Sequence, residues 1–144
     1  MARIRLENIS KVFSGNVEAV KNFSLTIPEK IVVSLLGPSG CGKTTTMRII
    51  AGLETPTVGR VYFDGQDVTD LPARERNVAM VFQFPAIYPN VTVQDNIVFP
   101  LKAQSLSKEE IDQRVSEVVR TLDLEGVLNN LPRSLDAGVR QKVA

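Results

Sequence analysis

The sequence predicts an α/β fold in which a buried strand, a glycine-rich loop and a helix follow one another directly. The main observation is the run GPSGCGKT, which begins at Gly37 and has the pattern Gly-x-x-x-x-Gly-Lys-Thr. Residues 31–36, immediately before it, are almost continuously apolar and β-branched, as expected of a strand buried on both faces. Residues 43–51, immediately after it, fit a helix that ends at Gly52.

The glycine-rich run predicts a phosphate-binding loop. Backbone N–H groups of such a turn wrap a phosphate, and the helix that follows presents its positive end to the same anion. Lys43 is expected to reach the β and γ phosphates, and the Thr44 hydroxyl to hold Mg²⁺. The residues predicted to bind are Gly37, Ser39, Gly40, Cys41, Gly42, Lys43, Thr44 and Thr45. Cys41 is interpreted as a small residue tolerated in the loop, with a reactive thiol as the alternative.

Composition narrows the class of protein. A chain of 144 residues with 43% hydrophobic and 23% charged residues is typical of one soluble globular domain. Its apolar runs fall well short of the roughly 18 residues that a membrane span needs, which predicts a cytoplasmic location. A net charge of +1 gives no reason to propose nucleic acid as a partner. The chain contains no histidine, so no histidine serves as base or ligand.

The segments before and after the loop have strand patterns. Apolar and polar residues alternate over 3–9 and over 22–27, which predicts two half-buried antiparallel strands. The run 60–65 ends in Asp-Gly, a hairpin turn signal. Residues 77–83 are predicted to form a second buried strand.

Helical patterns dominate from Thr92 onward. The runs 92–95 and 107–110 are both capping-box sequences, in which a hydroxyl and a carboxylate satisfy the exposed N–H groups at a helix start. An apolar stripe at helical spacing follows the second box and is interpreted as core packing rather than a binding surface: Ile111, Val115, Val118, Val119 and Leu122. These patterns divide the chain into a nucleotide-binding core with an antiparallel β subdomain, 1–91, and a helical subdomain, 92–144.

In order and spacing these motifs closely resemble the ATP-binding subunit of an ABC transporter, especially the sugar-importer (maltose-type) branch. The likeness covers essentially all 144 residues. It depends on the loop, on Phe13, on the run Met80-Val-Phe-Gln83 with Tyr88-Pro89 and Thr92-Val93 behind it, and on 135–144. The resemblance implies the P-loop NTPase fold of the ABC ATPase type, with an antiparallel β subdomain, a helical subdomain and an incomplete core sheet.

The resemblance also implies roles for individual residues. Phe13 occupies the place of an aromatic residue that stacks on adenine, although by itself it would be read as a core aromatic. Gln83 resembles the Q-loop glutamine, whose amide oxygen meets Mg²⁺ or the attacking water, with a strand-end glutamine bonded to backbone as the alternative. Lys43 and Gln83 are therefore the expected catalytic residues, and Thr44 and Gln83 the expected metal ligands, with ATP and Mg²⁺ as cofactors.

The implied partners are the transmembrane permease subunits and a second ATPase subunit in a homodimer. The region after Gln83 would contact the permease, although Phe84-Pro85 departs from the usual polar-aromatic pair. The protein would then be peripheral on the inner face of the cell membrane. The transported solute is not specified by the sequence.

The signature motif departs from the family pattern. In the family, Leu-Ser-Gly-Gly-Gln caps the γ-phosphate held by the partner subunit, whereas this chain has Leu135-Asp-Ala-Gly-Val139. Asp136 places a negative charge where the serine hydroxyl would meet that phosphate. Aspartate is also a favoured N-cap, so the helix is expected to form while its phosphate-capping role is impaired.

Two catalytic motifs of the family have no counterpart. The nearest run to the Walker B strand, 61–64, is followed by Gly65 and is better read as a hairpin, and there is no switch histidine.

The leading interpretation is the N-terminal part of an importer ATPase, which hydrolyses ATP once completed and dimerised; the alternative is a truncated, non-hydrolytic nucleotide-binding or assembly module. A GTPase is expected to have an Asn-Lys-x-Asp motif that recognises the base, and the sequence contains no such motif. Because unpaired apolar strands remain exposed, the isolated chain is expected to need a partner, swap elements or be only marginally soluble.

Overall fold

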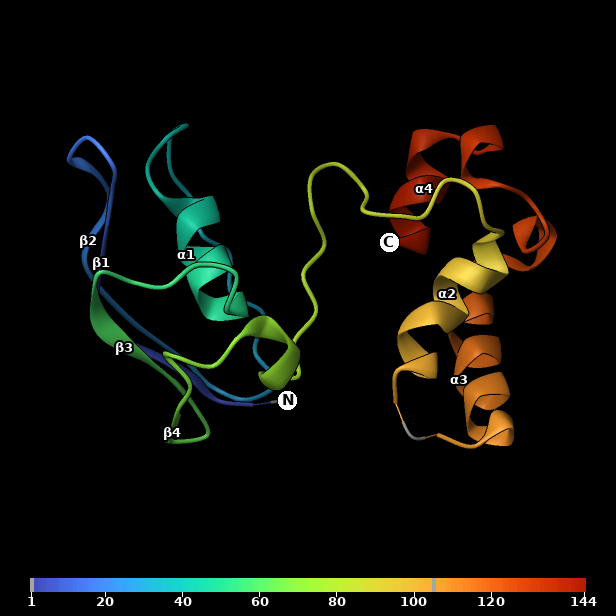
Figure 1. Cartoon of the computed structure of the whole chain (residues 1–144), viewed down its shortest axis with the longest axis horizontal. Helices are drawn as coiled ribbons and strands as arrows, with labels where there is room; N and C mark the ends of the chain where they lie inside the picture. Colours follow the sequence, from blue (N-terminus) through green and yellow to red (C-terminus); the bar gives the residue numbers. More distant parts are fainter. Residues whose placement is uncertain (1, 105) are drawn as a thin grey trace. The chain divides into compact units, whose positions relative to one another are not determined.

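The computed structural model describes residues 2–104 and 106–144. The chain divides into two compact units, Met1–Met80 and Val81–Ala144. The first unit contains a β-sheet and helix α1, and the second contains helices α2, α3 and α4 (Figure 1). Each unit is described by itself below.

The sheet of the first unit is antiparallel and has four strands. They are β1 (Ile4–Phe13), β2 (Val17–Ile27), β3 (Val58–Phe63) and β4 (Gln66–Asp67), arranged in the order β2-β1-β3-β4. The predicted antiparallel strands over 3–9 and 22–27 are confirmed and are longer than expected. The predicted hairpin is confirmed as well, since Asp64 and Gly65 both have positive φ, at 50° and 86°, as a type I′ turn requires.

One face of the sheet packs against helix α1 (Lys43–Ala51). Leu6 and Ile9 of β1 and Val61 of β3 are fully buried around Ile49 of the helix. A register shift between Leu6 and Ile9 interrupts the strict alternation of side chains along β1. The helix ends as predicted at Gly52, which has φ of 73°. The N–H of Leu53 donates to the Arg48 carbonyl at 2.9 Å, which satisfies a carbonyl at the helix end.

The second unit is helical. Its helices are α2 (Val93–Lys102), α3 (Lys108–Thr121) and α4 (Ala137–Val143). Short 3₁₀ turns lie at Ala73–Glu75 in the first unit and at Glu125–Val127 and Pro132–Ser134 in the second. Val115 and Val119 of the predicted stripe are buried with Leu124, which confirms a packing role, whereas Val118 is exposed. Among the described residues, no helix combines the length and apolar character needed to cross a membrane.

The two predicted capping boxes differ in detail. Ser107 and Glu110 form the complete box, because the Glu110 carboxylate accepts the Ser107 N–H at 2.8 Å. At the start of α2, Thr92 caps the Asp95 N–H at 3.1 Å, but the Asp95 carboxylate accepts the Thr92 hydroxyl at 2.7 Å. Aspartate is one methylene shorter than glutamate, so its carboxylate reaches only the hydroxyl and the box at 92–95 is half formed.

Two predicted strands are wrong. Residues 31–36 and 77–83 are irregular, and the exposed fraction of the residue reaches 96% at Val32 and 89% at Leu36. A strand buried on both faces needs neighbouring strands to satisfy its backbone groups. The sheet of the described residues does not extend to either segment, so their apolar pattern finds no partner.

Candidate functional site

The glycine-rich loop ends where α1 begins, and β2 lies directly behind it. Gly42 is the N-cap residue and has φ of 88°, in the left-handed region that favours glycine. A Cβ at this position would collide with the Ala19 carbonyl oxygen and lie 3.2 Å from Val20 Cγ2. The close approach of the loop to β2 therefore requires glycine here.

The N-terminus of α1 is left open by the sequence. Gly42 has no side chain to act as a cap, no capping bond from a side chain is found, and the first turn contains no acidic residue. The first intrahelical bond runs from the Thr46 N–H to the Gly42 carbonyl at 2.8 Å. The amides of residues 43–45 precede that bond and carry the positive end of the helix dipole. This arrangement is suited to binding an anion.

The Lys43 ammonium lies over the loop itself. It donates to the Gly37 carbonyl at 2.8 Å, to the Pro38 carbonyl at 2.6 Å and to the Cys41 Sγ at 3.4 Å. These contacts account for the three donors of an ammonium group. The structure therefore brings the predicted residues Gly37, Cys41, Gly42 and Lys43 together around one positive charge.

A cavity of about 380 Å³ separates part of the loop from β2. Gly40, Cys41 and Lys43 line it on the loop side, and Thr46 lies at its helical edge. Thr46 is buried and was missed by sequence reasoning, because its hydroxyl is indistinguishable from those of its neighbours in the sequence. Ser39 and Thr44 are exposed, and Thr45 is half-buried.

Phe13 ends β1 with 39% of its surface exposed. The Lys11 ammonium lies 5.1 Å from the centroid of its ring, a distance typical of a cation–π contact. Lys11 is itself held by Glu54 at 2.7 Å and by the Thr55 carbonyl at 2.8 Å. The hydrogen bond from Lys11 lowers the pKa of Glu54. Phe13 lies outside the lining of the loop cavity, and its stacking role stays a prediction.

Gln83 belongs to the second unit and lies in an irregular, exposed stretch. The side chain of Gln141 donates to the neighbouring Phe82 carbonyl at 3.4 Å, which ties this stretch to α4. The expected metal ligands Thr44 and Gln83 thus come from different units. Within the described part of the chain, no cluster of three or more His, Cys, Asp or Glu side chains is arranged to hold a metal ion.

Helix α4 forms at the altered signature motif, as the sequence predicts. Asp136 is the N-cap, and its Oδ1 accepts the Val139 N–H at 2.9 Å. The predicted N-cap role of Asp136 is therefore confirmed. Its carboxylate occupies the helix start at which the family pattern has a serine hydroxyl.

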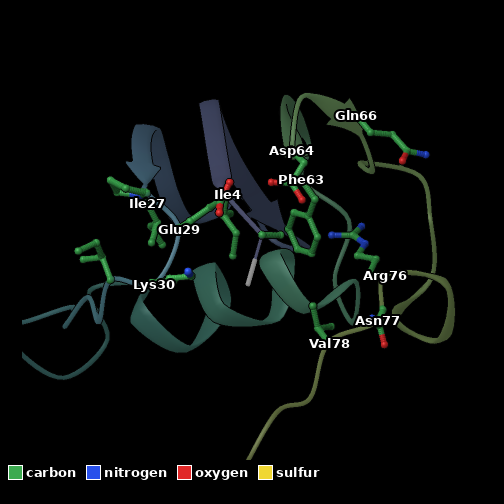
Figure 2. Close-up of a pocket in the computed structure, with 13 residues that line it drawn as sticks. Ile4, Ile27, Glu29, Lys30, Phe63, Asp64, Gln66, Arg76, Asn77 and Val78 are labelled. Atoms are coloured by element: carbon green, nitrogen blue, oxygen red, sulfur yellow. The ribbon is translucent and has the colours of Figure 1, made fainter.

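A larger cavity of about 770 Å³ lies elsewhere in the first unit and contains none of the predicted site residues (Figure 2). Ile4, Ile27 and Phe63 provide apolar lining, and Arg76 and Asn77 lie on one side of it. Arg76 is a residue that sequence reasoning missed. In the sequence Arg76 is one of three successive charged residues, 74–76, and nothing there distinguishes it from Arg74.

Comparisons with known proteins agree with the fold. The sequence profile described as "ABC transporter" matches residues 20–144. A solved structure described as the dimeric post-hydrolysis state of the ATP-binding cassette MJ0796, bound to ADP and Pi, aligns with a TM-score of 0.85 and 34% sequence identity. The alignment covers 97% of this chain and 66% of that one. The predicted fold class, a P-loop NTPase of the ABC ATPase type with an incomplete core sheet, is confirmed.

Curated relatives match along the whole chain. The trehalose/maltose import ATP-binding protein MalK of Thermococcus litoralis is 50% identical, and the glucose import ATP-binding protein GlcV of Saccharolobus solfataricus is 48% identical. Both alignments cover 100% of this chain, but only 40% and 42% of the relatives. The chain thus spans about two fifths of their length. Because the family profile matches most of the sequence, the chain belongs to the ABC transporter family, and it is similar to sugar-import ATP-binding proteins of that family.

Proposed function

We propose that the chain binds MgATP and forms the nucleotide-binding part of an ATPase that powers import of a sugar-type solute. The observation that carries the proposal is the uncapped N-terminus of α1, with Gly42 packed on β2 and the Lys43 ammonium over the loop. Open amides, the positive end of a helix dipole and a lysine charge all lie at this loop, a combination suited to stabilising a phosphate group.

Binding would exchange partners at Lys43. In the structure its donors are satisfied by the Gly37 and Pro38 carbonyls and by the Cys41 thiol, so a phosphate oxygen has to replace at least one of them. A charge-assisted bond to a phosphate oxygen is stronger than a bond to a neutral carbonyl, which favours the exchange. The Thr44 hydroxyl and the Gln83 amide oxygen would hold Mg²⁺, which neutralises phosphate charge when bound.

Titration with a fluorescent ATP analogue tests the binding proposal. Lys43→Ala removes the loop charge and is expected to weaken binding at least about tenfold, the scale of one lost charge-assisted bond. Lys102→Ala is the matched control, because this exposed lysine ends α2 in the other unit. Equal affinities of Lys43→Ala and the parent would refute the assignment of the loop.

The helical unit offers a surface for the proposed permease contact. A groove of about 740 Å³ lies along α2, α3 and α4 and includes Tyr88 and Phe99, whose ring centroids are 4.8 Å apart. Both residues are more than half exposed, at 52% and 55%, and Phe84 is exposed at 82%. Exposed aromatic side chains beside an apolar groove favour a protein partner. We propose a cytoplasmic segment of the permease as its occupant.

Asp136 favours a second candidate function, a nucleotide-binding module that does not hydrolyse. Its carboxylate already accepts the Val139 N–H, so it presents negative charge rather than a hydroxyl donor at the helix start. The discriminating experiment uses the chain fused to the remaining sequence of a close relative. Asp136→Ser with Ala137→Gly and Val139→Gln is expected to tighten ATP-driven dimerisation about tenfold or more; equal dimerisation of the two fusions would remove the support for this candidate.

A further inference from the structure

Arg76 is a buried arginine whose hydrogen bonds all go to backbone carbonyls. Only 5% of its surface is exposed. Its Nε donates to the Leu71 carbonyl at 2.7 Å, and its Nη2 to the Thr69 carbonyl at 2.9 Å. Its Nη1 donates to the Ile49 carbonyl at 2.7 Å and to the Ile50 carbonyl at 3.0 Å. Four of the five guanidinium N–H donors are therefore used.

The four acceptors belong to two segments that are far apart in the sequence. Ile49 and Ile50 lie in the last turn of α1, where carbonyl groups lack the usual partner four residues on. The Ile49 carbonyl also accepts the Gly52 N–H at 3.2 Å. Thr69 and Leu71 lie in the turn that follows β4. Because the C-terminal end of a helix is its negative end, it stabilises the guanidinium charge. Burial lowers the pKa of Arg76, and the Asp70 carboxylate opposes that change.

Gly52 leaves the space that Arg76 occupies. A Cβ on Gly52 would lie 2.6 Å from the Arg76 Nε and 2.9 Å from the Ala73 backbone nitrogen. The residue that ends α1 and the side chain that caps its last carbonyls thus fit each other. Figure 2 shows Arg76 at the wall of the large cavity with Phe63 and Asn77, but its donors are committed to the backbone rather than free for a ligand.

We infer that Arg76 is a positioning residue for the phosphate loop: it clamps the far end of α1 to the segment 69–76. The inference rests on the proposed function of the loop in binding phosphate. Ile49 and Ile50 come six and seven residues after Lys43 in the helix, so about 10 Å separates the clamp from Lys43 at the other end. A short helix behaves as a rigid body over this distance. Fixing its C-terminal end therefore fixes the direction in which the amides of residues 43–45 point.

The chemistry calls for arginine rather than any cation. Four acceptors on two segments are reached at once only by a planar fork of donors, whereas a lysine ammonium offers three donors from a single atom. Arg76→Lys keeps the charge and removes the fork. Arg74→Lys is the matched control, because Arg74 lies two residues away, is exposed and forms an ion pair with its neighbour Glu75.

The first measurement is hydrogen exchange of the full chain without nucleotide. In Arg76→Lys, the amides at the end of α1 and those of 69–76 are expected to exchange at least tenfold faster than in the parent. The amides of α3 in the other unit should not change, and Arg74→Lys should match the parent throughout. Unchanged exchange at α1 in Arg76→Lys would overturn the clamp, whether or not the chain binds nucleotide.

The second measurement adds MgATP and separates positioning from a purely structural role. Coupling between two sites is reciprocal, so MgATP should slow exchange over 69–76 in the parent, and this effect should disappear in Arg76→Lys. The affinity of the folded Arg76→Lys chain should fall about tenfold. Faster exchange at α1 with unaltered MgATP affinity would overturn the positioning role. If the parent fails to bind MgATP, the proposed function fails and the exchange data alone decide the clamp.

Discussion

At the scale of single residues, polar side chains hold the end of the sheet in the first unit. Asp67 accepts the Thr69 hydroxyl at 2.6 Å and the Thr69 N–H at 2.9 Å, and it pairs with Arg60. Thr69 in turn accepts the Val61 N–H at 2.9 Å in the core. The bonds from Thr69, followed by that from Arg60, lower the pKa of Asp67 to about 2. A surface carboxylate therefore organises a buried contact.

These contacts predict a pH dependence of stability. The pKa of Asp67 falls from 3.8 to about 2 on folding, so its contribution is present above about pH 4 and is lost as the pH falls toward 2. Asp67→Asn should flatten this part of the profile in urea unfolding. Asp112→Asn, at an exposed position of α3, is the control and should keep the slope of the parent. An unchanged slope in Asp67→Asn would contradict the assignment.

The role of the loop residues could be predicted from the sequence, whereas the role of Arg76 could not. The pattern around Gly42 and Lys43 reflects backbone chemistry within eight residues, so the sequence alone identifies it. The contacts of Arg76 join carbonyls 26 and 27 residues away with others five and seven residues away. No local pattern encodes such a convergence. The roles of Phe13 and Gln83 in the site stay predictions.

At the scale of elements, Gly52 ends α1 for two reasons: its backbone has a positive φ, and a side chain here would collide with Arg76. A pair of glycine substitutions separates these two effects. Gly65→Ala, at φ of 86° with nothing within 4 Å of the added Cβ, should cost about 1 kcal/mol of unfolding free energy for the backbone conformation alone. Gly52→Ala, at φ of 73°, adds the collision with Arg76 and should cost about 1 kcal/mol or more beyond that. Urea unfolding measures both. Equal losses of unfolding free energy in the two variants would show that Arg76 moves away from the added Cβ at little cost.

Elements with local signals were the ones that the sequence predicted well. The hairpin at 64–65, the capped start of α3 and the glycine end of α1 depend on residues within one turn of each other. The segments 31–36 and 77–83 carry an equally strong apolar pattern but are irregular. These segments would form strands only by pairing with neighbouring strands, and such pairing depends on several segments of the chain rather than on a local pattern.

At the scale of the whole molecule, the exposed apolar segment 31–36 predicts self-association. Val32 and Leu36 are 96% and 89% exposed, which leaves apolar side chains and unpaired backbone in contact with water. Sedimentation velocity of the chain is expected to show concentration-dependent oligomers, which Val32→Thr with Leu36→Gln should reduce. Val17→Thr with Val58→Thr is the control, since these residues are exposed on regular strands. A monodisperse parent with a sharp unfolding transition would contradict this expectation.

The central claim is that the loop recognises the phosphates of a nucleotide, and it makes the sharpest prediction for the intact molecule. Calorimetric titration of the chain with MgATP and with adenosine compares ligands that share the base and differ in phosphate. Because adenosine has no phosphate for the uncapped amides of α1 and the Lys43 ammonium to bind, MgATP should bind at least about a hundredfold more tightly, the effect of two or three charge-assisted bonds. Equal affinity for adenosine and MgATP would contradict the account.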